Sequence, residues 1–455
     1  MMTKEASKRP INRLKSMYAL RALVDQMYQG GIDAGKQGRP VAWCMQDPFT
    51  GPILNAMDIE SVYPENFGTV CAASEGAAAA FLERAEADGF PTHLCGYARN
   101  CLGYTARMLD MDGIPPEAPG GGMPRPTVLL ASGIACDSRF KWFQALGRYL
   151  DAPVYIAETP MPGAKESLME GAHERDIKVY TQEIRDLVAF LEKTTGRKMD
   201  WDKFSREVDA TMEMDKAFWE VNELRKARPG PMHSRDFWSS MTASLFRASN
   251  PTAVKELYRQ MYEEVKYRVD NKISGINREE KYRLLFEGIP PWHSLKIFDE
   301  LAERGWNFVT ERIYHPPRPI DLSMYSDPAE RLARYRFQGM SHLIDAEFAP
   351  EEAAQIKAEI MEKGFSDKVS VRYARDYQVD GAFIHSVLSC RALSAPLNLF
   401  QAQVMAVWKV PSLTVEGDMV DTSLFDPAEV LRKAEAFEET MDYYKKVRQQ
   451  AGLEW

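Results

Sequence analysis

The 455-residue sequence lacks the features that mark several classes of protein. It has only six cysteines and no C-x₂-C pair, so neither a disulfide scaffold nor a zinc finger is expected. No run of about 18 apolar residues predicts a membrane span. No apolar segment follows the basic N-terminus, as it would in a secretory signal. We therefore expect a cytoplasmic protein that makes no contact with a membrane.

Two further absences narrow the choice of ligand. The sequence has no G-x-x-x-x-G-K-[ST] motif and no G-x-G-x-x-G after a strand, so we expect no ATP site of the P-loop kind. The formal net charge is −9, and no basic block stands out. Nucleic acid is therefore not an expected partner. A hydrophobic content of 45% in so long a chain is enough for two or three domains with their own cores.

Apolar periodicity divides the chain into five segments. We predict a helical N-terminal arm at 1–38, a first α/β domain at 39–164, a helical insertion at 165–278, a second α/β domain at 279–425 and a C-terminal helix at 426–455. In both α/β segments strands alternate with helices, which predicts parallel sheets covered by helices. The expected fold class is α/β, with two flavodoxin-like or Rossmann-like parallel-sheet domains that face each other.

Short apolar runs between turn residues predict the strands. In the first domain the predicted strands are 40–47, 66–74, 91–97, 127–136 and 152–160. In the second domain they are 282–292, 306–314, 379–385 and 410–418. Ligands of open α/β sheets bind at the carboxyl ends of the strands, so residues just past these runs are the candidates for function.

Three cysteines lie at such positions. Cys95, Cys136 and Cys390 each follow an apparent strand, and the third belongs to the second domain. If the two sheets face each other, all three thiolates can reach one cleft between the domains. Three thiolates suit an iron–sulfur cluster that keeps one iron free of cysteine. The alternative is that these are buried, inert cysteines, which are common in proteins.

The other three cysteines have less favourable positions. Cys44 and Cys71 lie in or beside predicted strands among small apolar residues, and we interpret them as core. Cys101 lies one to two helical turns beyond Cys95, so it is the main rival of Cys95 as a metal ligand.

Polar residues near these strand ends complete the candidate site. His385 and Ser386, just ahead of Cys390, are the candidate catalytic residues. His385 either donates a proton to a bound substrate or is a satisfied interior histidine. The candidate substrate-binding residues are Tyr97, Arg99, Glu416 and Asp418. The acids of the VEGDMVD run, among them Asp421, either shape a pocket or cap the following turn.

Several of these motifs together resemble one protein family. THLCGYARNCLG, SGIACDSRFKWF and HSVLSCR, with YPENFGTVCAASEGAAAAFLERAEADG and VEGDMVD, are similar to the 2-hydroxyacyl-CoA dehydratase / benzoyl-CoA reductase family. The resemblance covers about residues 38 to 425 and implies two flavodoxin-like domains with a helical part. It also implies that Cys95, Cys136 and Cys390 bind a [4Fe–4S] cluster, near which an acyl-CoA thioester would lie.

The resemblance also implies partners and an activity. The chain would pair with a homologous second catalytic subunit and receive electrons from ATP-hydrolysing iron–sulfur activator subunits, indirectly from ferredoxin. The wording LCGYARNCLG looks most like the larger catalytic subunit of an ATP-dependent class I benzoyl-CoA reductase. The expected function is therefore reduction of the ring of benzoyl-CoA. The alternatives are a 2-hydroxyacyl-CoA dehydratase subunit and a non-catalytic electron-transfer subunit.

Overall fold

The computed structural model contains two four-stranded parallel sheets, which confirms the predicted fold class. It describes residues 9–45, 50–74, 76–133, 136, 138–158, 165–245, 250–316, 318–341, 344, 348–363, 368–394, 397–453 and 455. Residues 1–8 of the predicted arm lie outside the described residues.

Both sheets have the same strand order. The first sheet contains β1 (Val41–Cys44), β2 (Glu60–Val62), β3 (Val128–Ser132) and β4 (Val154–Ala157). The second contains β5 (Tyr282–Glu287), β6 (Trp306–Glu311), β7 (Gly381–Val387) and β8 (Ser412–Gly417). The orders are β2-β1-β3-β4 and β6-β5-β7-β8, which correspond to the 2-1-3-4 part of a flavodoxin-like sheet. The predicted flavodoxin-like arrangement is therefore present in both halves.

This strand order decides where ligands can bind. The order reverses between β1 and β3 in one sheet and between β5 and β7 in the other, and such switch points open a crevice at the carboxyl ends of the strands. Cys136 follows β3 and Cys390 follows β7, so the two thiols occupy corresponding places. All residues of β3 and β5 are buried, as expected for strands covered on both faces.

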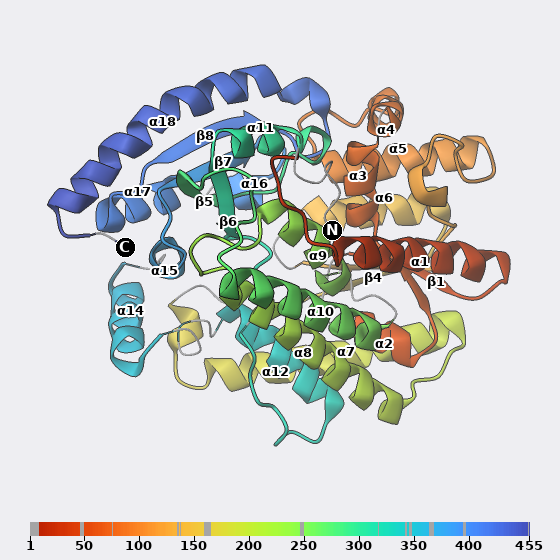
Figure 1. The fold of residues 1–455 in the computed structure, drawn as a ribbon. Helices are drawn as coiled ribbons and strands as arrows, with labels where there is room; N and C mark the ends of the chain where they lie inside the picture. The colour runs from red at the N-terminus through yellow and green to blue at the C-terminus, as the bar shows by residue number, and fades with distance from the viewer. Residues whose placement is uncertain are drawn as a thin grey trace.

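Helices surround both sheets (Figure 1). In the first half they are α1 (Met17–Lys36), α2 (Thr50–Ala56), α3 (Pro64–Ala73), α4 (Ala77–Ala87), α5 (Gly96–Asp110) and α6 (Ser138–Leu150). The predicted insertion contains α7 (Ala172–Thr195), α8 (Trp201–Leu224), α9 (Ser234–Leu245) and α10 (Pro251–Asp270). The second half adds α11 (Ile297–Glu303), α12 (Pro328–Ser341), α14 (Pro350–Lys363), α15 (Lys368–Asp376), α16 (Arg391–Ser394), α17 (Leu397–Trp408) and α18 (Pro427–Gln450).

The C-terminal helix α18 runs along the outer side of the second sheet (Figure 1). It begins as the sequence predicts, because Asp426 accepts the N–H groups of residues 428 and 429 and Pro427 occupies the first turn. Its apolar face covers β7 so closely that a side chain at Gly381 would meet Phe437 and Met441.

Two strand predictions are wrong. Residues 66–73 belong to α3 and Ser74 follows it, because Pro64 starts a helix and a short run of small apolar residues does not distinguish a helix from a strand. Residues 91–95 form turns that lead into α5, so Cys95 precedes a helix and does not end a strand. The strand that pairs with β1 is β2, whose three residues are too few to show alternation.

Several helices were also not predicted. Pro229–Pro231 hid the start of α9, and α2, α15, α16 and α17 were not recognised. The strands of the two sheets lie at 41–157 and 282–417, inside the two predicted α/β segments. One large cluster of buried apolar side chains includes residues of both sheets, for example Leu129 and Phe286. The five domain limits themselves stay predictions.

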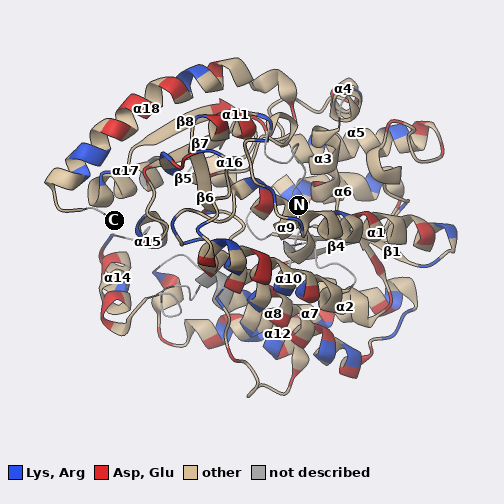
Figure 2. Cartoon of the chain, viewed as in Figure 1, with Lys and Arg blue, Asp and Glu red and all other residues tan. Residues whose placement is uncertain are grey.

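Charges of both signs alternate over the described surface helices, as α18 illustrates (Figure 2). None of the described helices has the length and the apolar character that crossing a bilayer requires.

Candidate functional site

Cys95 lies directly before α5, and its carbonyl oxygen accepts the N–H of Arg99 at 3.0 Å. Burial raises the pKa of the Cys95 thiol well above its ordinary value. The thiols of Cys136 and Cys390 raise that pKa further by electrostatic repulsion. Cys95 is therefore a protonated, largely enclosed thiol with two other thiols in its neighbourhood.

Cys136 and Cys390 approach from the two sheets. The Sγ of Cys136 lies 2.8 Å from the Oγ of Ser138 at the start of α6. Cys390 follows β7 and donates its N–H to the carbonyl of Val387 at 3.0 Å. Burial raises the pKa of Cys390, and the nearby Cys136 adds to that rise. All three thiols therefore share one electrostatic environment, although they come from distant parts of the sequence.

The donor set suits a cluster better than a single ion. Among the described residues, no three His, Cys, Asp or Glu side chains are grouped so that they could hold one metal ion. A [4Fe–4S] cluster makes a different demand, because each cysteine binds its own iron atom. Three soft thiols meet that demand, and a cluster would displace their protons on binding. The residues therefore fit the cluster, while the cluster itself stays a proposal.

The remaining cysteines are part of the core. Cys44, Cys71 and Cys101 are completely buried, which confirms the core interpretation of the first two. Burial raises the pKa of Cys101 to about 12, and the hydroxyl of Thr105 donates to its carbonyl oxygen at 2.8 Å within the core. The thiol that raises the pKa of Cys101 further is that of Cys71, whereas the thiols of Cys136 and Cys390 raise the pKa of Cys95. This difference favours Cys95 over Cys101 as the ligand.

Two acids of the VEGDMVD run, Asp418 and Asp421, cap turns, which is the second of the two interpretations offered by the sequence. Asp418 is fully buried and accepts the N–H groups of Val420 and Asp421 at 2.8 and 2.9 Å. Asp421 accepts the N–H of Ser423 at 3.0 Å and caps the short helix that follows. Glu416 is exposed on β8, opposite Ser386 of β7 in the strand register.

Arg99 and Tyr97 are held inside the protein. The guanidinium of Arg99 is completely buried and donates to Glu86 and to Asp421, each at 2.7 Å. The hydroxyl of Tyr97 accepts the indole N–H of Trp292 at 2.5 Å. Both side chains thus connect α5 to segments of the second half, and their predicted contact with substrate stays untested.

His385 is an interior histidine in this structure. It is only 1% exposed, and its Nδ1 lies 2.5 Å from the carbonyl oxygen of Ile289, so Nδ1 carries the proton. Its Nε2 lies beside Phe425 and has no hydrogen-bond partner among the described residues. Burial lowers the pKa of His385 to about 4, so the ring is neutral at pH 7. This geometry gives little support to the predicted proton donor.

We expect the buried histidine to make stability depend on pH. Below its unfolded pKa of about 6.5 the unfolded chain binds a proton that folded His385, with a pKa of about 4, does not. The free energy of unfolding should therefore fall by about 3 kcal/mol between pH 7 and pH 4 because of this group. Urea unfolding at several pH values measures how the free energy of unfolding changes with pH. This dependence should become weaker in His385→Gln and stay the same in His93→Gln, which changes a histidine at an exposed position.

Three residues near Cys390 escaped the sequence analysis. Arg139 of α6 donates to both oxygens of Glu65 in α3, at 3.1 and 3.2 Å, and both charges affect the pKa of Cys390. Tyr314 follows β6 with an unusual positive φ of 71° and lies near Glu65 and Cys390. Burial raises the pKa of Tyr314, so its phenol keeps its proton. Glu65 and Arg139 lie inside the family-like motifs, but Tyr314 has no sequence signal except its place after a strand.

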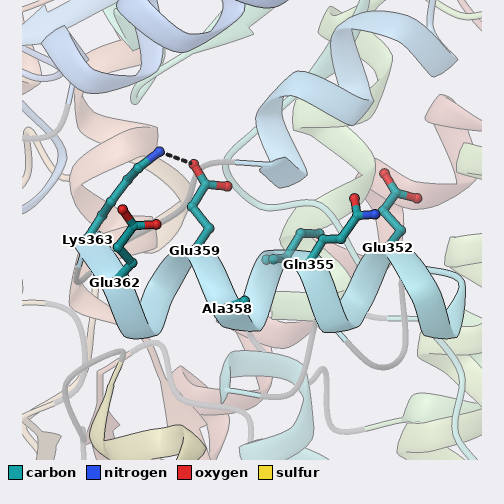
Figure 3. Close-up of a pocket in the computed structure, with 7 residues that line it drawn as sticks. Glu352, Gln355, Ala358, Glu359, Glu362 and Lys363 are labelled. Atoms are coloured by element: carbon teal, nitrogen blue, oxygen red, sulfur yellow. Dashed lines mark hydrogen bonds and ion pairs between the residues drawn. The ribbon is translucent and has the colours of Figure 1, made fainter.

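A groove on α14 lies elsewhere in the molecule. Its lining includes Glu352, Glu359 and Glu362, and Lys363 binds Glu359 at 3.3 Å (Figure 3). In Figure 1 α14 lies on the opposite side of the molecule from α5, so this groove is not part of the cysteine site.

Comparison with known proteins identifies one family for this chain. Residues 52–441 match the family model described as 2-hydroxyglutaryl-CoA dehydratase, D-component. The chain belongs to this family. The match includes all three cysteines and both sheets except β1. The predicted resemblance to the family is therefore confirmed.

Curated members of the wider family align over most of the chain. The (R)-phenyllactyl-CoA dehydratase alpha subunit of Clostridium sporogenes is 25% identical, with 95% of this chain and 97% of the relative covered. The (R)-2-hydroxyglutaryl-CoA dehydratase alpha subunit of Acidaminococcus fermentans is 22% identical, with 93% and 96% covered. One subunit of the benzoyl-CoA reductase of Thauera aromatica is 25% identical, with 79% of each chain covered. The chain is thus similar to subunits of enzymes whose names refer to acyl-CoA thioesters.

Proposed function

We propose that this chain is the catalytic, cluster-binding subunit of a 2-hydroxyacyl-CoA dehydratase. The observation that carries the proposal is similarity along nearly the whole chain to dehydratase alpha subunits, combined with three thiols that share one environment. The reaction removes the hydroxyl from C2 and a hydrogen from C3 of a 2-hydroxyacyl-CoA. The products are water and a 2-enoyl-CoA, so no net electron is consumed.

Cys95, Cys136 and Cys390 would hold the [4Fe–4S] cluster, which supplies a low-potential electron when it is bound. The enclosed site limits loss of that electron to solvent protons. Removal of hydrogen from C3 needs a base, because this position is only weakly acidic. The carboxylate of Glu65, oriented by Arg139 and close to Cys390, is the group that we assign to this task.

Tyr314 complements Glu65. Its phenol stays protonated and lies near Cys390 and Glu65, so its Oη–H can donate a hydrogen bond to a thioester or hydroxyl oxygen of the substrate. His385 is neutral, with its proton engaged by Ile289, so it acts as a support for the loop after β5. We therefore assign the proton-transfer and hydrogen-bonding roles to Glu65 and Tyr314 in place of His385.

A second candidate is the ring reduction of benzoyl-CoA. It is favoured by the 25% identity to the benzoyl-CoA reductase chain, which equals the identity to the phenyllactyl-CoA dehydratase chain. The smaller coverage, 79% against 95%, makes it the second choice. Under either function we propose a homologous second catalytic subunit and ATP-hydrolysing iron–sulfur activator subunits fed indirectly by ferredoxin, all in the cytoplasm.

The number of electrons consumed separates the two candidates. The chain is co-expressed anaerobically with its neighbouring subunits and assayed with ATP, reductant and either (R)-2-hydroxyacyl-CoA thioesters or benzoyl-CoA. A dehydratase should form many enoyl-CoA molecules for each electron supplied and should not consume reductant with benzoyl-CoA. Steady use of two electrons for each benzoyl-CoA would instead establish the reductase. Purified protein with far fewer than about four irons per chain would contradict both candidates.

A further inference from the structure

A buried carboxylate lies where the loop after β8 meets the start of α5. Asp418 follows β8 and is completely buried. Its Oδ1 accepts two backbone N–H groups, from Val420 and Asp421, at 2.8 and 2.9 Å. These bonds fix the plane of the carboxylate and leave Oδ2 directed to another partner.

That partner is the hydroxyl of Ser389. The Ser389 hydroxyl donates to Oδ2 of Asp418 and accepts the backbone N–H of Gly96 at 3.3 Å. Ser389 directly precedes Cys390, and Gly96 directly follows Cys95. One hydroxyl thus connects the segments that carry two of the three thiols, and those segments belong to opposite halves of the chain.

The chain leaves no room for a side chain at this connection. A Cβ at position 96 would collide with Oδ1 of Asp418 and crowd the Cβ of Val420. Glycine is therefore required where α5 approaches the loop after β8. Asp418 also lies near enough to Cys95 to raise the pKa of that thiol.

We propose that Asp418 is a positioning residue for the iron–sulfur cluster: through Ser389 and Gly96 it holds the Cys95 and Cys390 segments together, and its negative charge lowers the reduction potential of the cluster. This inference rests on the proposed cluster and deepens it. Asp418 only accepts hydrogen bonds, from two N–H groups and one O–H group, as an ionised carboxylate does. A fixed negative charge disfavours the addition of an electron to the cluster, which lowers its reduction potential. Residues that contact the metal ligands tune reduction potentials in this way.

The test compares three variants of the anaerobically purified protein with the wild type. Asp418→Asn keeps the size of the side chain and removes its charge. Ser389→Ala removes the connecting hydroxyl and keeps the charge. Glu439→Gln removes one charge at an exposed position of α18 and is the matched control. An EPR-monitored redox titration gives the cluster potential, and an iron chelator gives the rate of cluster loss.

We expect Asp418→Asn to raise the potential by about 59 mV, which is a tenfold change for one electron. Ser389→Ala should keep the potential but lose iron about tenfold faster, since a hydrogen bond to a charged group is lost. Glu439→Gln should match the wild type in both measurements. A purely structural Asp418 would change the rate of loss and not the potential.

Two results would overturn the inference: a potential in Asp418→Asn equal to that of Glu439→Gln, or a rate of iron loss in Ser389→Ala equal to that of the wild type. If Asp418→Asn does not fold, the rate measured in Ser389→Ala decides. Failure of the proposed cluster is a separate outcome, because wild-type protein would then contain no iron to titrate, and a reductase in place of a dehydratase would leave the expected differences between the variants unchanged.

Discussion

Cys136→Ser is expected to lose the bound iron and the dehydration activity, with the chain still folded. The serine hydroxyl is a harder ligand that stays protonated, so it does not replace a thiolate on iron. Activity should fall by more than about 100-fold, the upper range for removing only an outer partner of a metal ligand. Iron and acid-labile sulfide analysis measures the first effect, and circular dichroism verifies the fold.

The buried cysteines provide matched controls for this experiment. Cys71 and Cys101 are also thiols of the first half, but they are completely buried in the core and lie near each other. Cys71→Ser and Cys101→Ser should keep the iron content of the wild type, at some cost in stability. Loss of the cluster in Cys101→Ser, with retention in Cys95→Ser, would show that the first ligand has been assigned to the wrong residue.

Arg99→Met is expected to lower the free energy of unfolding by about 3 kcal/mol. Arg99 is completely buried, and the side chain of its partner Asp421 is only 11% exposed, so the substitution leaves a buried carboxylate without its cation. Because this pair joins α5 to the loop after β8, the loss should also loosen the contact between the two halves beside the thiols. Urea unfolding at pH 7 gives the free energy, provided the m-value is unchanged.

Arg84 offers the comparison for this prediction. It also binds two carboxylates, Asp88 and Asp110, but it lies at the surface of α4, and its side chain is 26% exposed. Exposed pairs of this kind contribute little, so Arg84→Met should change stability far less than Arg99→Met. Equal effects of the two substitutions would mean that burial does not decide the strength of the Arg99 contacts.

The sequence was most informative where strands are long and buried. The runs at β3, β5 and β7 are mostly apolar, so turn residues on both sides were enough to locate them. The same rule failed for α3 and for residues 91–95, where short apolar segments fit a helix or a turn as well as a strand. Sheet pairing, which no local pattern encodes, was needed to find β2.

The candidate site shows the same limits. The three cysteines could be selected because turns and strand ends are visible in sequence, even though the strand before Cys95 does not exist. The role of Arg99 could not be predicted, because its partner Asp421 lies 322 residues away in the chain. Asp418 binds Ser389, which is 29 residues away, and it is connected to the first half only through the contact of Ser389 with Gly96, at a separation of 293 residues. Glu65 and Tyr314 are far from Cys390 in the sequence, and only the fold brings them near it.

The shared strand order of the two sheets has one further consequence. Each half repeats one plan, and Cys136 and Cys390 are equivalent under the pseudo-symmetry that relates the halves. Cys95, in the connection between β2 and β3, has no counterpart, because residues 312–380 between β6 and β7 contain no cysteine. If residues 312–380 also carried a cysteine at the place equivalent to Cys95, four cysteines would be available to the proposed cluster. In the proposed cluster, this difference between the halves would leave one iron without a cysteine ligand.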